Sequence, residues 1–495
     1  MVKKVLSRIS LILTLLLLCM SAKADTPYQR PANPKFKSDA VENYIKAQQQ
    51  KFNSPELSSL FTRTFPYSLD NTVFQQNVDT SVDISSLRTY VVTGSDLQAM
   101  WLRDSSNQLI PYAFLVPKDD RLFKLLVGLA NSQAEFVLKD SFANAFIVPN
   151  GAKSSHDDDQ TYRQFQQAAM QPPVFERKFE PDSLAAVLKL QRVILENASA
   201  QQKQQLSDDI QKSWQLADNV IVDLLSAWTG DFDNLTNPIN QYYYYFSRPG
   251  ADSLNTLENG IGKPSKTTGL VRTLFRPSDD ATTFPFNVPV NFMVASELKG
   301  LATQYTNITN IDNQITPKLI GISNKILQAL KINSTEGSGT RTRYSYELDG
   351  FGNRTFMDDG NIPSLLSLPV IAPNLYDANI YMQTRKQILN SSTNPYFFNG
   401  SNSVQAGVGS PHTGKNRIWP LSLISQAESS TDENEIKHLL AALVNSSQKN
   451  GLIYESYSSS NYQDITRENF AWANAEFANF IIWLTEKHPS VVLKS

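Results

Sequence analysis

The stretch WQLADNVIVDLLSAW, residues 214–228, decides the fold class. Its apolar residues recur at spacings of three and four, which places them on one face of a helix, whereas a strand would alternate apolar and polar residues. These residues are Trp214, Ala217, Val220, Ile221, Leu224, Leu225 and Trp228. We therefore predict an amphipathic helix that packs against a core.

The same period recurs along the chain. It is found in residues 122–137, 184–195, 292–301, 322–330, 436–444 and 470–484, and we count about ten to twelve candidate helices by this criterion. Only residues 343–347 suggest strand pairing. No regular alternation of strand and helix separates the helical segments, which counts against a doubly wound sheet. The sequence predicts an all-α protein.

Long polar connections lie between these segments. Residues 237–269, 340–361 and 391–416 are rich in Pro, Gly, Asn and aromatic residues, and loops of this length are unusual unless they are functional. We find no internal repeat and no linker that divides the chain. We therefore expect residues 25–495 to form a single helical domain whose long loops gather at one end and build a site.

The first 24 residues have the layout of a signal peptide. A basic start with Lys3, Lys4 and Arg8 precedes an apolar run over residues 9–20 and small residues at Ala22 and Ala24. The apolar run is short for a membrane span. We expect cleavage before Asp25, a periplasmic or secreted protein, and no stable membrane insertion after signal removal. A retained membrane anchor is the alternative.

The amino-acid composition limits which side chains can act as catalytic groups. The one cysteine, Cys19, lies in the expected signal peptide, so the mature chain has neither a disulfide nor a cysteine nucleophile. The four histidines are scattered and form no HExxH motif, so we expect no metal and no cofactor. The 45 basic and 47 acidic residues give a formal charge of −2, which argues against nucleic-acid binding. Carboxylates and hydroxyls remain as catalytic groups.

One segment approaches the phosphate-binding loop of nucleotide hydrolases. GSPHTGKN, residues 409–416, ends on Asn416 where that loop has the Ser or Thr that binds magnesium, and a poor strand precedes it. We therefore predict no nucleotide site. RIWPLSLISQA follows and predicts a helix that begins near Trp419 and Pro420. His412 then lies in the loop before a helix, either as a ligand of sugar hydroxyls or as a structural histidine.

Five segments place charged residues beside aromatic residues or prolines. They are residues 94–112, 175–184, 275–292, 357–369 and 454–477. Glycoside hydrolysis is a reaction that uses two positioned carboxyl groups and no metal. One carboxyl must keep a proton, which burial against aromatic residues favours, and the other must stay ionised. Composition does not identify the pair.

Six motifs together resemble one enzyme family. TGSDLQAMWLRDS, FERKFEPDSL, FRPSDDA, DGFGNRTFMDDGNIPSLLSLP, SPHTGKNRIWPL and FAWANAEF occur in this order over most of the chain. They resemble glycoside hydrolase family 125, the exo-acting α-1,6-mannosidases. The resemblance implies an (α/α)6 barrel with long loops that form the active-site mouth. It also implies metal-independent, inverting hydrolysis of a mannose-containing oligosaccharide or glycan.

The resemblance also implies residue roles. Glu455 corresponds to the general base, and either Asp279 or Asp280 corresponds to the general acid. Adjacent residues of a helix or strand face different ways, so only one of the two is the acid, and both alternatives stay open. The implied substrate-binding residues are Trp101, Arg103, Asp104, Asp358, Asp359, His412, Arg467 and Trp472. Asp358 and Asp359 compete for the acid role, and Glu176 and Asp182 are expected behind the contact residues.

Three departures from the family pattern bear on substrate preference. Tyr454 stands where we expect histidine and could reshape the pocket beside Glu455, Gly360 stands where we expect alanine, and Glu468 and Asn469 follow Arg467 where we expect a pair that contains an aromatic residue. Two other functions remain as alternatives. One is an (α/α)6-barrel glycosidase that acts on α-glucosides, and the other is a non-catalytic mannan-binding protein.

Overall fold

Six helices form a closed ring in the part of the chain that the structure describes. The computed structural model describes residues 27–76, 83–206, 208–308, 314–401 and 403–494. The ring consists of α5 (Leu102–Leu109), α7 (Pro181–Asn197), α11 (Val288–Tyr305), α13 (Leu368–Ile371), α15 (Pro420–Glu428) and α17 (Ala471–Lys487). Each ring helix contacts the next, and α17 closes the ring on α5.

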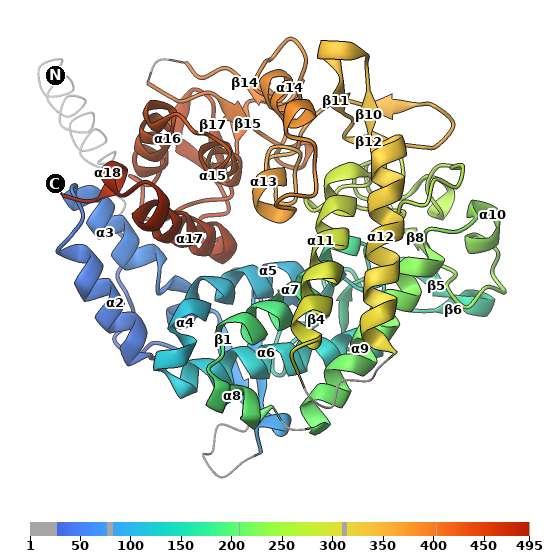
Figure 1. Ribbon diagram of the computed structural model, residues 1–495, viewed down its shortest axis with the longest axis horizontal. Coiled ribbons are helices and arrows are strands. Elements are labelled where there is room, and N and C mark those ends of the chain that lie inside the picture. The colour runs from blue at the N-terminus through green and yellow to red at the C-terminus, as the bar shows by residue number, and fades with distance from the viewer. Residues whose placement is uncertain (1–26, 77–82, 207, 309–313, 402, 495) are drawn as a thin grey trace, which may run out of the picture.

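A second layer of helices lies outside the ring. It consists of α2 (Asp39–Gln49), α3 (Pro55–Thr64), α4 (Tyr67–Asn71), α6 (Asp120–Lys139), α9 (Asp208–Ala227), α12 (Ile315–Asn333), α14 (Ala378–Ile388) and α16 (Glu433–Ser446). In Figure 1 the blue helix α3 lies beside the red helix α17, so the two ends of the chain complete the same barrel. The predicted (α/α)6 barrel is confirmed.

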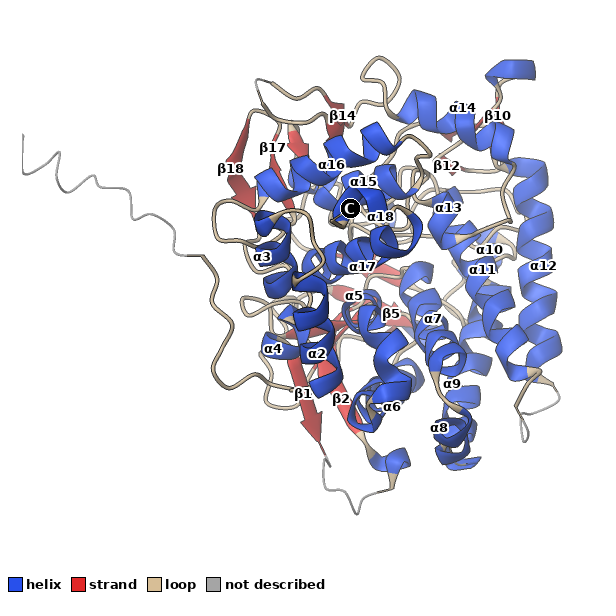
Figure 2. Cartoon of the chain, turned by 60° about the vertical axis from the view of Figure 1, so that its left-hand side comes forward, coloured by secondary structure: helices blue, strands red, loops and turns tan. Residues whose placement is uncertain are grey.

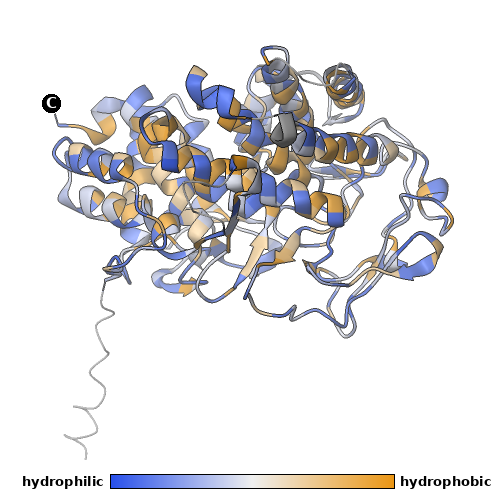
Figure 3. Cartoon of the chain, turned by 90° about the horizontal axis from the view of Figure 1, so that it is seen from below, coloured by the Kyte–Doolittle hydropathy of each residue, from blue (hydrophilic) through white to orange (hydrophobic). Residues whose placement is uncertain are grey.

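Helices of both layers carry the apolar spacing that predicted them. The outer helix α6 buries the leucines of one face and exposes charged residues on the other, and Figure 3 shows hydrophobic and hydrophilic residues sharing such helices. The predicted segments coincide with α6, α7, α9, α11, α12, α16 and α17, and α15 begins at Pro420 as expected. All eight residues of α5 are buried, although most of them are polar, and this helix was not predicted.

The connections before the inner helices are much longer than those after them. Before the inner helices run the long connections 72–101, 140–180, 228–287, 334–367, 389–419 and 447–470. After them run the shorter connections 110–119, 198–207, 306–314, 372–377 and 429–432, with α8 (Ala200–Gln205) in one of them. The long loops, with α10 (Phe232–Leu235) in one of them, therefore gather at the end of the barrel where the inner helices begin.

Short antiparallel strands organise these loops, and here the sequence prediction was incomplete. Residues 343–347 were the only stretch expected to pair, whereas the structure has several sheets of two or three strands (Figure 2). The strands are β1 (Val73–Gln76), β2 (Arg88–Val91), β3 (Ala99–Trp101), β4 (Ala145–Ile147), β5 (Gln160–Arg163), β6 (Gln167–Ala168), β7 (Val174–Glu176), β8 (Tyr245–Ser247), β9 (Phe286–Asn287), β10 (Thr335–Glu336), β11 (Arg343–Tyr344), β12 (Glu347–Leu348), β13 (Arg354–Thr355), β14 (Phe397–Phe398), β15 (Gly407–Val408), β16 (Arg417–Ile418), β17 (Ser456–Ser458) and β18 (Asn461–Thr466). Most are too short to show an alternating pattern.

The chain ends with α18 (Pro489–Val492). The expected signal peptide, residues 1–24, lies outside the described residues. Among the described helices, none combines the length and the apolar character that a membrane crossing requires.

Candidate active site

The candidate residues lie in the long loops or in the first turn of the inner helix that follows. Arg103 and Asp104 begin α5, Asp279 and Asp280 precede α11, and Glu455 precedes α17. The six sequence motifs thus correspond to the six inner helices in order. This arrangement brings residues that are far apart in sequence to one mouth of the barrel.

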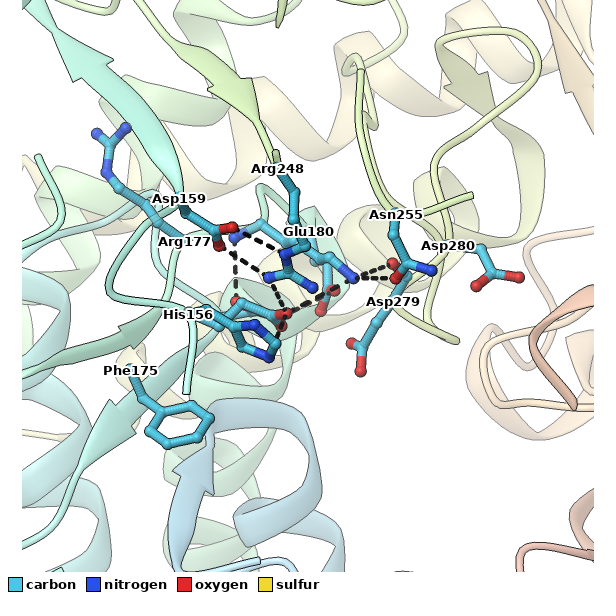
Figure 4. Close-up of polar contacts among 12 residues, drawn as sticks. His156, Asp159, Phe175, Arg177, Glu180, Arg248, Asn255, Asp279 and Asp280 are labelled. Atoms are coloured by element: carbon cyan, nitrogen blue, oxygen red, sulfur yellow. Dashed lines mark hydrogen bonds and ion pairs between the residues drawn. The ribbon is translucent and has the colours of Figure 1, made fainter. Parts of the chain in front are cut away.

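A tight turn directs Asp279 and Asp280 to different places. The Arg276 amide donates to the Asp280 carbonyl (2.7 Å), and the Asp279 amide donates to the Arg276 carbonyl (2.9 Å). Asp279 has φ 67°, a left-handed conformation that aspartate tolerates better than most residues. Figure 4 shows the two carboxylates pointing apart. The Asp279 side chain is 24% exposed and that of Asp280 is 1% exposed, so only Asp279 faces solvent.

A single guanidinium gathers four carboxyl groups beside this turn. Arg103 Nη1 contacts Glu180 (2.9 Å) and Asp182 (3.1 Å), while Nη2 contacts Asp104 (3.3 Å) and Asp279 (3.7 Å). All of these side chains except Asp279 are nearly inaccessible to solvent. Burial raises the pKa of Asp104 to about 6, although the Arg103 charge opposes the rise.

Two of these carboxyl groups, Glu180 and Asp279, lie on different nitrogens of the same guanidinium. Burial, followed by the negative charge of Asp279, raises the pKa of Glu180 well above its usual range. Burial alone would also raise the pKa of Asp279, but the positive charges of Arg103 and Lys178 outweigh it and lower the value to about 2. The charge of Asp279 thus opposes ionisation of Glu180.

Asp280 belongs to a second, buried group of side chains. His412 Nδ1 lies 3.0 Å from Asp280 Oδ1. Burial alone would lower the pKa of His412, but the hydrogen bond and charge of Asp280, together with the charges of Glu455 and Asp279, raise it to about 9. Asp359 accepts a hydrogen bond from Ser278 (2.7 Å). Burial raises the pKa of Asp359, and the negative charge of Asp280 raises it further. Its side chain, like that of Asp280, is almost completely buried.

Glu455 is positioned from two sides. Its Oε1 lies 3.6 Å from Nε of Arg467, whose side chain is 30% exposed. Behind it, Asn474 of α17 accepts from the Ile453 amide (2.9 Å) and donates to the Ile453 carbonyl (2.9 Å). The helix thus holds the segment that carries Glu455. The negative charge of Glu455 also helps to raise the pKa of His412.

The remaining predicted residues differ in what they can contact. Asp358 is completely buried, and its two oxygens accept the amides of Leu365 (2.8 Å) and Leu366 (2.9 Å), which leaves it no surface for a sugar. Burial raises its pKa to about 8. Trp472 is also buried, with the Arg103 guanidinium 5.2 Å from the centre of its ring, so it supports Arg103 from behind. Trp101 is 7% exposed and packs edge-on against Phe175.

Several important side chains were not singled out in the sequence. Besides Glu180, they are Asn144, Asp159, Lys178 and Arg248. Lys178 Nζ donates to the Asp279 carbonyl (2.7 Å), and Arg248 bridges Asp159 and Glu176 (Figure 4). Five charged residues in the eight positions of ERKFEPDS, residues 176–183, were the available signal. Glu176 and Asp182 lie behind Lys178 and Arg103 as expected, fully buried.

Two of the three departures from the family pattern are residues packed inside the protein. The Tyr454 hydroxyl donates to Asn450 Oδ1 (2.7 Å), and the ring packs with Tyr67, Leu452 and Ala471. Tyr454 is fully buried there, so any influence on the pocket beside Glu455 comes through packing and not through contact with solvent. Gly360 is required by packing, since a Cβ at this position would lie 2.7 Å from Cβ of Trp419.

The phosphate-loop-like segment has another structure. Pro411–Thr413 forms a single 3₁₀ turn and the segment leads into β16, so the strand, glycine-rich loop and helix of a phosphate site do not follow one another here. Among the described residues, no group of three His, Cys, Asp or Glu is arranged to hold a metal ion. A cavity of about 400 Å³ lies beside the Asp279–Asp280 turn, lined by Leu274, Ala281 and the 253–263 loop, but none of the candidate residues lines it.

Solved structures resemble this barrel. An α-mannosidase of Streptococcus pneumoniae, from a family described as metal-independent and solved as a non-productive complex with α-1,6-mannobiose, is 28% identical. The match covers 92% of this chain and 100% of that one, with a TM-score of 0.78. A glucoamylase of Saccharomycopsis fibuligera is 11% identical, with a TM-score of 0.54 over 93% of this chain and 98% of that one, which shows the shared fold alone.

Sequence comparisons agree. The Meiotically up-regulated gene 157 protein of Schizosaccharomyces pombe is 35% identical over 475 residues, which cover 95% of this chain and 90% of that protein. The family model of metal-independent α-mannosidases, glycoside hydrolase family 125, matches residues 54–482. The protein therefore belongs to glycoside hydrolase family 125, the metal-independent α-mannosidases.

Proposed function

We propose that this α-mannosidase releases terminal mannose from α-1,6-linked mannosides by a single inverting displacement. The observation that carries the proposal is that Asp279, beside Arg103, and Glu455, beside Arg467, stand on separate loops that precede inner helices at the same end of the barrel. The family match supports the mannoside as substrate. The α-1,6-mannobiose bound by the Streptococcus pneumoniae relative supports the linkage.

Asp279 is the general acid in this proposal. It is the member of the Asp279–Asp280 pair with an exposed carboxyl group, whereas Asp280 is buried and ion-paired with His412. A general acid must reach the glycosidic oxygen, and geometry precedes pKa in this choice. Asp280 then fixes His412, whose positively charged ring can donate a hydrogen bond to a sugar hydroxyl.

Glu455 is the general base in this proposal. It removes a proton from a water molecule as that water attacks the anomeric carbon from the face opposite the leaving oxygen, so the configuration inverts. Inversion requires the two carboxyl groups to stand about 6.5 to 9.5 Å apart, with room for that water. Arg467, beside Glu455, and Arg103 and Asp104, beside Asp279, are the charged groups available to fix sugar hydroxyls.

A proton NMR time course on α-1,6-mannobiose tests the proposal. The expected first product is β-mannose, which then mutarotates to the equilibrium mixture. Initial α-mannose would contradict inversion. Cleavage of α-glucosides in place of the mannobiose would favour the glucosidase alternative, and binding without consumption would favour the mannan-binding one. Mannobioses with other linkages, run in parallel, test the α-1,6 preference.

We also propose that the enzyme is exported. The proposal rests on the signal-peptide layout of residues 1–24. Amino-terminal sequencing of the protein from the extracytoplasmic fraction should begin at Asp25. A cytoplasmic protein that keeps Met1 would contradict export.

A further inference from the structure

A buried ammonium group lies where two of the long mouth loops meet. Lys178 belongs to the loop before α7, and its side chain is 2% exposed. Its Nζ donates to the Asp279 carbonyl (2.7 Å) and to Asn255 Oδ1 (3.3 Å), both in the loop before α11, and lies 3.6 Å from Glu176 Oε1 (Figure 4). An ammonium group has three donors. Three oxygen atoms thus surround it, one for each donor, and fix its position.

Charges of alternating sign keep this ammonium group buried. Glu176 also accepts from Arg248 (2.8 Å), and Arg248 makes two hydrogen bonds to Asp159, both of 2.8 Å. The side chains of Glu176 and Asp159 are almost inaccessible to solvent. Two acids and two bases therefore alternate from Asp159 to Lys178. Buried charges are tolerated when they are paired and hydrogen-bonded, so this row of charges holds Lys178 against the Asp279 carbonyl.

The residue that Lys178 contacts has an unusual backbone conformation. Asp279 has φ 67°, which a residue with a side chain adopts at a cost and keeps only where its surroundings hold it. Asn361 holds an earlier part of the turn by donating to the Pro277 carbonyl (2.9 Å), and Lys178 holds the carbonyl of Asp279 itself. The direction of the Asp279 carboxyl group therefore depends on this ammonium group.

We propose that Lys178 positions the carboxyl group of Asp279 for proton transfer to the glycosidic oxygen. The proposal rests on the proposed function, in which Asp279 is the general acid. Lys178 is a positioning residue in it, because it acts on the backbone of Asp279 and neither gives nor takes the transferred proton. A general acid must stand within hydrogen-bond reach of the atom that it protonates, so a small displacement of Asp279 slows cleavage of the C1–O bond.

Leaving-group dependence of Lys178→Met tests the proposal. Methionine keeps an apolar side chain of similar length beside the Phe275 ring, whose centre lies 5.3 Å from Nζ, but it cannot donate to the Asp279 carbonyl. We expect kcat on α-1,6-mannobiose to fall about 10-fold to 100-fold through misplacement of the acid. On 2,4-dinitrophenyl α-mannoside kcat should change by less than about threefold, because dinitrophenolate leaves without protonation.

The pH profile separates the effect of position from the effect of charge. Burial opposes ionisation of Asp279, whereas the positive charges of Arg103, Lys178 and His412 favour it. Lys178→Met therefore raises the pKa of Asp279, and the alkaline limb of kcat on mannobiose should move to higher pH. The acids that share Arg103 with Asp279 are unchanged in this variant; they are Asp104, Glu180 and Asp182. Because a larger share of Asp279 is then protonated, a lower kcat reflects its position and not its charge.

A second substitution and a control accompany this variant. Lys178→Gln keeps a polar group beside Glu176 but is too short to reach the Asp279 carbonyl. It should show the same selectivity and serves if the methionine variant does not fold. Lys325→Met is the matched control, because Lys325 of α12 also donates a hydrogen bond of 2.7 Å, to Thr229. It should leave kcat on both substrates and the alkaline limb as in the wild type.

Asp279→Asn separates failure of this inference from failure of the proposed function. If Asp279→Asn is selective for the dinitrophenyl substrate but both Lys178 variants lose the two activities equally, Asp279 is the acid and the inference about Lys178 is wrong. An unchanged or higher kcat on mannobiose in the Lys178 variants also overturns the inference. If Asp279→Asn retains turnover of mannobiose, the assignment of the acid is wrong.

Discussion

At the scale of single residues, Glu455 is the side chain that we expect to matter most for turnover. Glu455→Gln preserves shape and hydrogen bonding but removes the base, so kcat on α-1,6-mannobiose should fall about 100-fold to 10,000-fold. KM should change little, because the amide still contacts Arg467 and water. Steady-state kinetics measure this.

Glu486→Gln provides the control for the Glu455 variant. It makes the same chemical change on the exposed side of α17, and its kcat should equal that of the wild type. Normal turnover in Glu455→Gln would show that another group activates the water.

Gly360 carries a prediction about packing. A methyl group at this position would lie 2.7 Å from Trp419 Cβ and 3.1 Å from the Val408 carbonyl. We expect Gly360→Ala to lower the free energy of unfolding by about 1–3 kcal/mol through overpacking. Gly321, exposed in the middle of α12, is the contrast, because nothing lies within 4 Å of its Cβ position. Gly321→Ala should raise stability by about 0.5–1 kcal/mol. Thermal unfolding measures the stability of both variants. Equal changes in melting temperature would show that a methyl group at position 360 does not clash with Trp419.

At the scale of elements, the same hydrogen-bond arrangement fixes two of the long mouth loops to inner helices. Asn474 of α17 makes two hydrogen bonds to the backbone of Ile453, and Asn291 of α11 makes the same pair to Val271. Val271 leads into the turn that carries Asp279, and Ile453 lies two residues before Glu455. One buried amide per helix thus satisfies loop backbone that water cannot reach.

Loss of the Asn474 contact should affect stability and turnover together. Asn474→Ala leaves a buried amide and a buried carbonyl unpaired, at a cost of about 1–3 kcal/mol for each group. We expect a lower melting temperature and a lower kcat because Glu455 loses its support. Asn197→Ala, which breaks one bond within α7 itself, should lower the melting temperature less and leave kcat unchanged. A destabilised Asn474→Ala with normal kcat would show that other contacts position Glu455.

The elements also show how far the sequence could lead. Helices of both layers were predicted where apolar residues recur at spacings of three and four, as in α9 of the outer layer and α17 of the inner one. The inner helix α5 was not predicted, because its Arg103, Asp104, Ser105 and Ser106 look like a surface in the sequence but are all buried. The same limit applies to the site. The motifs indicated Glu455 and one of Asp279 and Asp280, but the meeting of Asp279 and Glu180 at Arg103 depends on where separate loops lie in space.

At the scale of the whole molecule, the closed ring holds a further pair of carboxyl groups on two adjacent helices. The charge of Glu476 of α17 acts on Glu428 of α15, and the charge of Lys189 of α7 acts on both. Burial raises the pKa of both acids, and for Glu428 the charge of Glu476 adds to the effect. Three ring helices therefore each contribute one charged group to this part of the ring.

This pair should make the barrel less stable at higher pH. An acid whose pKa is raised by folding stabilises the folded state below its unfolded pKa, about 4.3 for glutamate, and that stability is lost as the pH rises through the folded value. The melting temperature should therefore fall between pH 5 and pH 8. Glu476→Gln leaves one carboxyl group for Lys189 and should reduce this fall, with a higher melting temperature than the wild type at pH 8.

Thermal unfolding of both proteins across this pH range measures the effect, and Glu486→Gln on the exposed side of the same helix should keep the wild-type slope. If the melting temperature of Glu476→Gln falls with pH as steeply as that of the wild type, the two carboxyl groups do not change their protonation state in this pH range. Because α15 and α17 are adjacent in the ring, a reduced slope would show that the stability of the barrel depends on the protons that this pair of carboxyl groups holds.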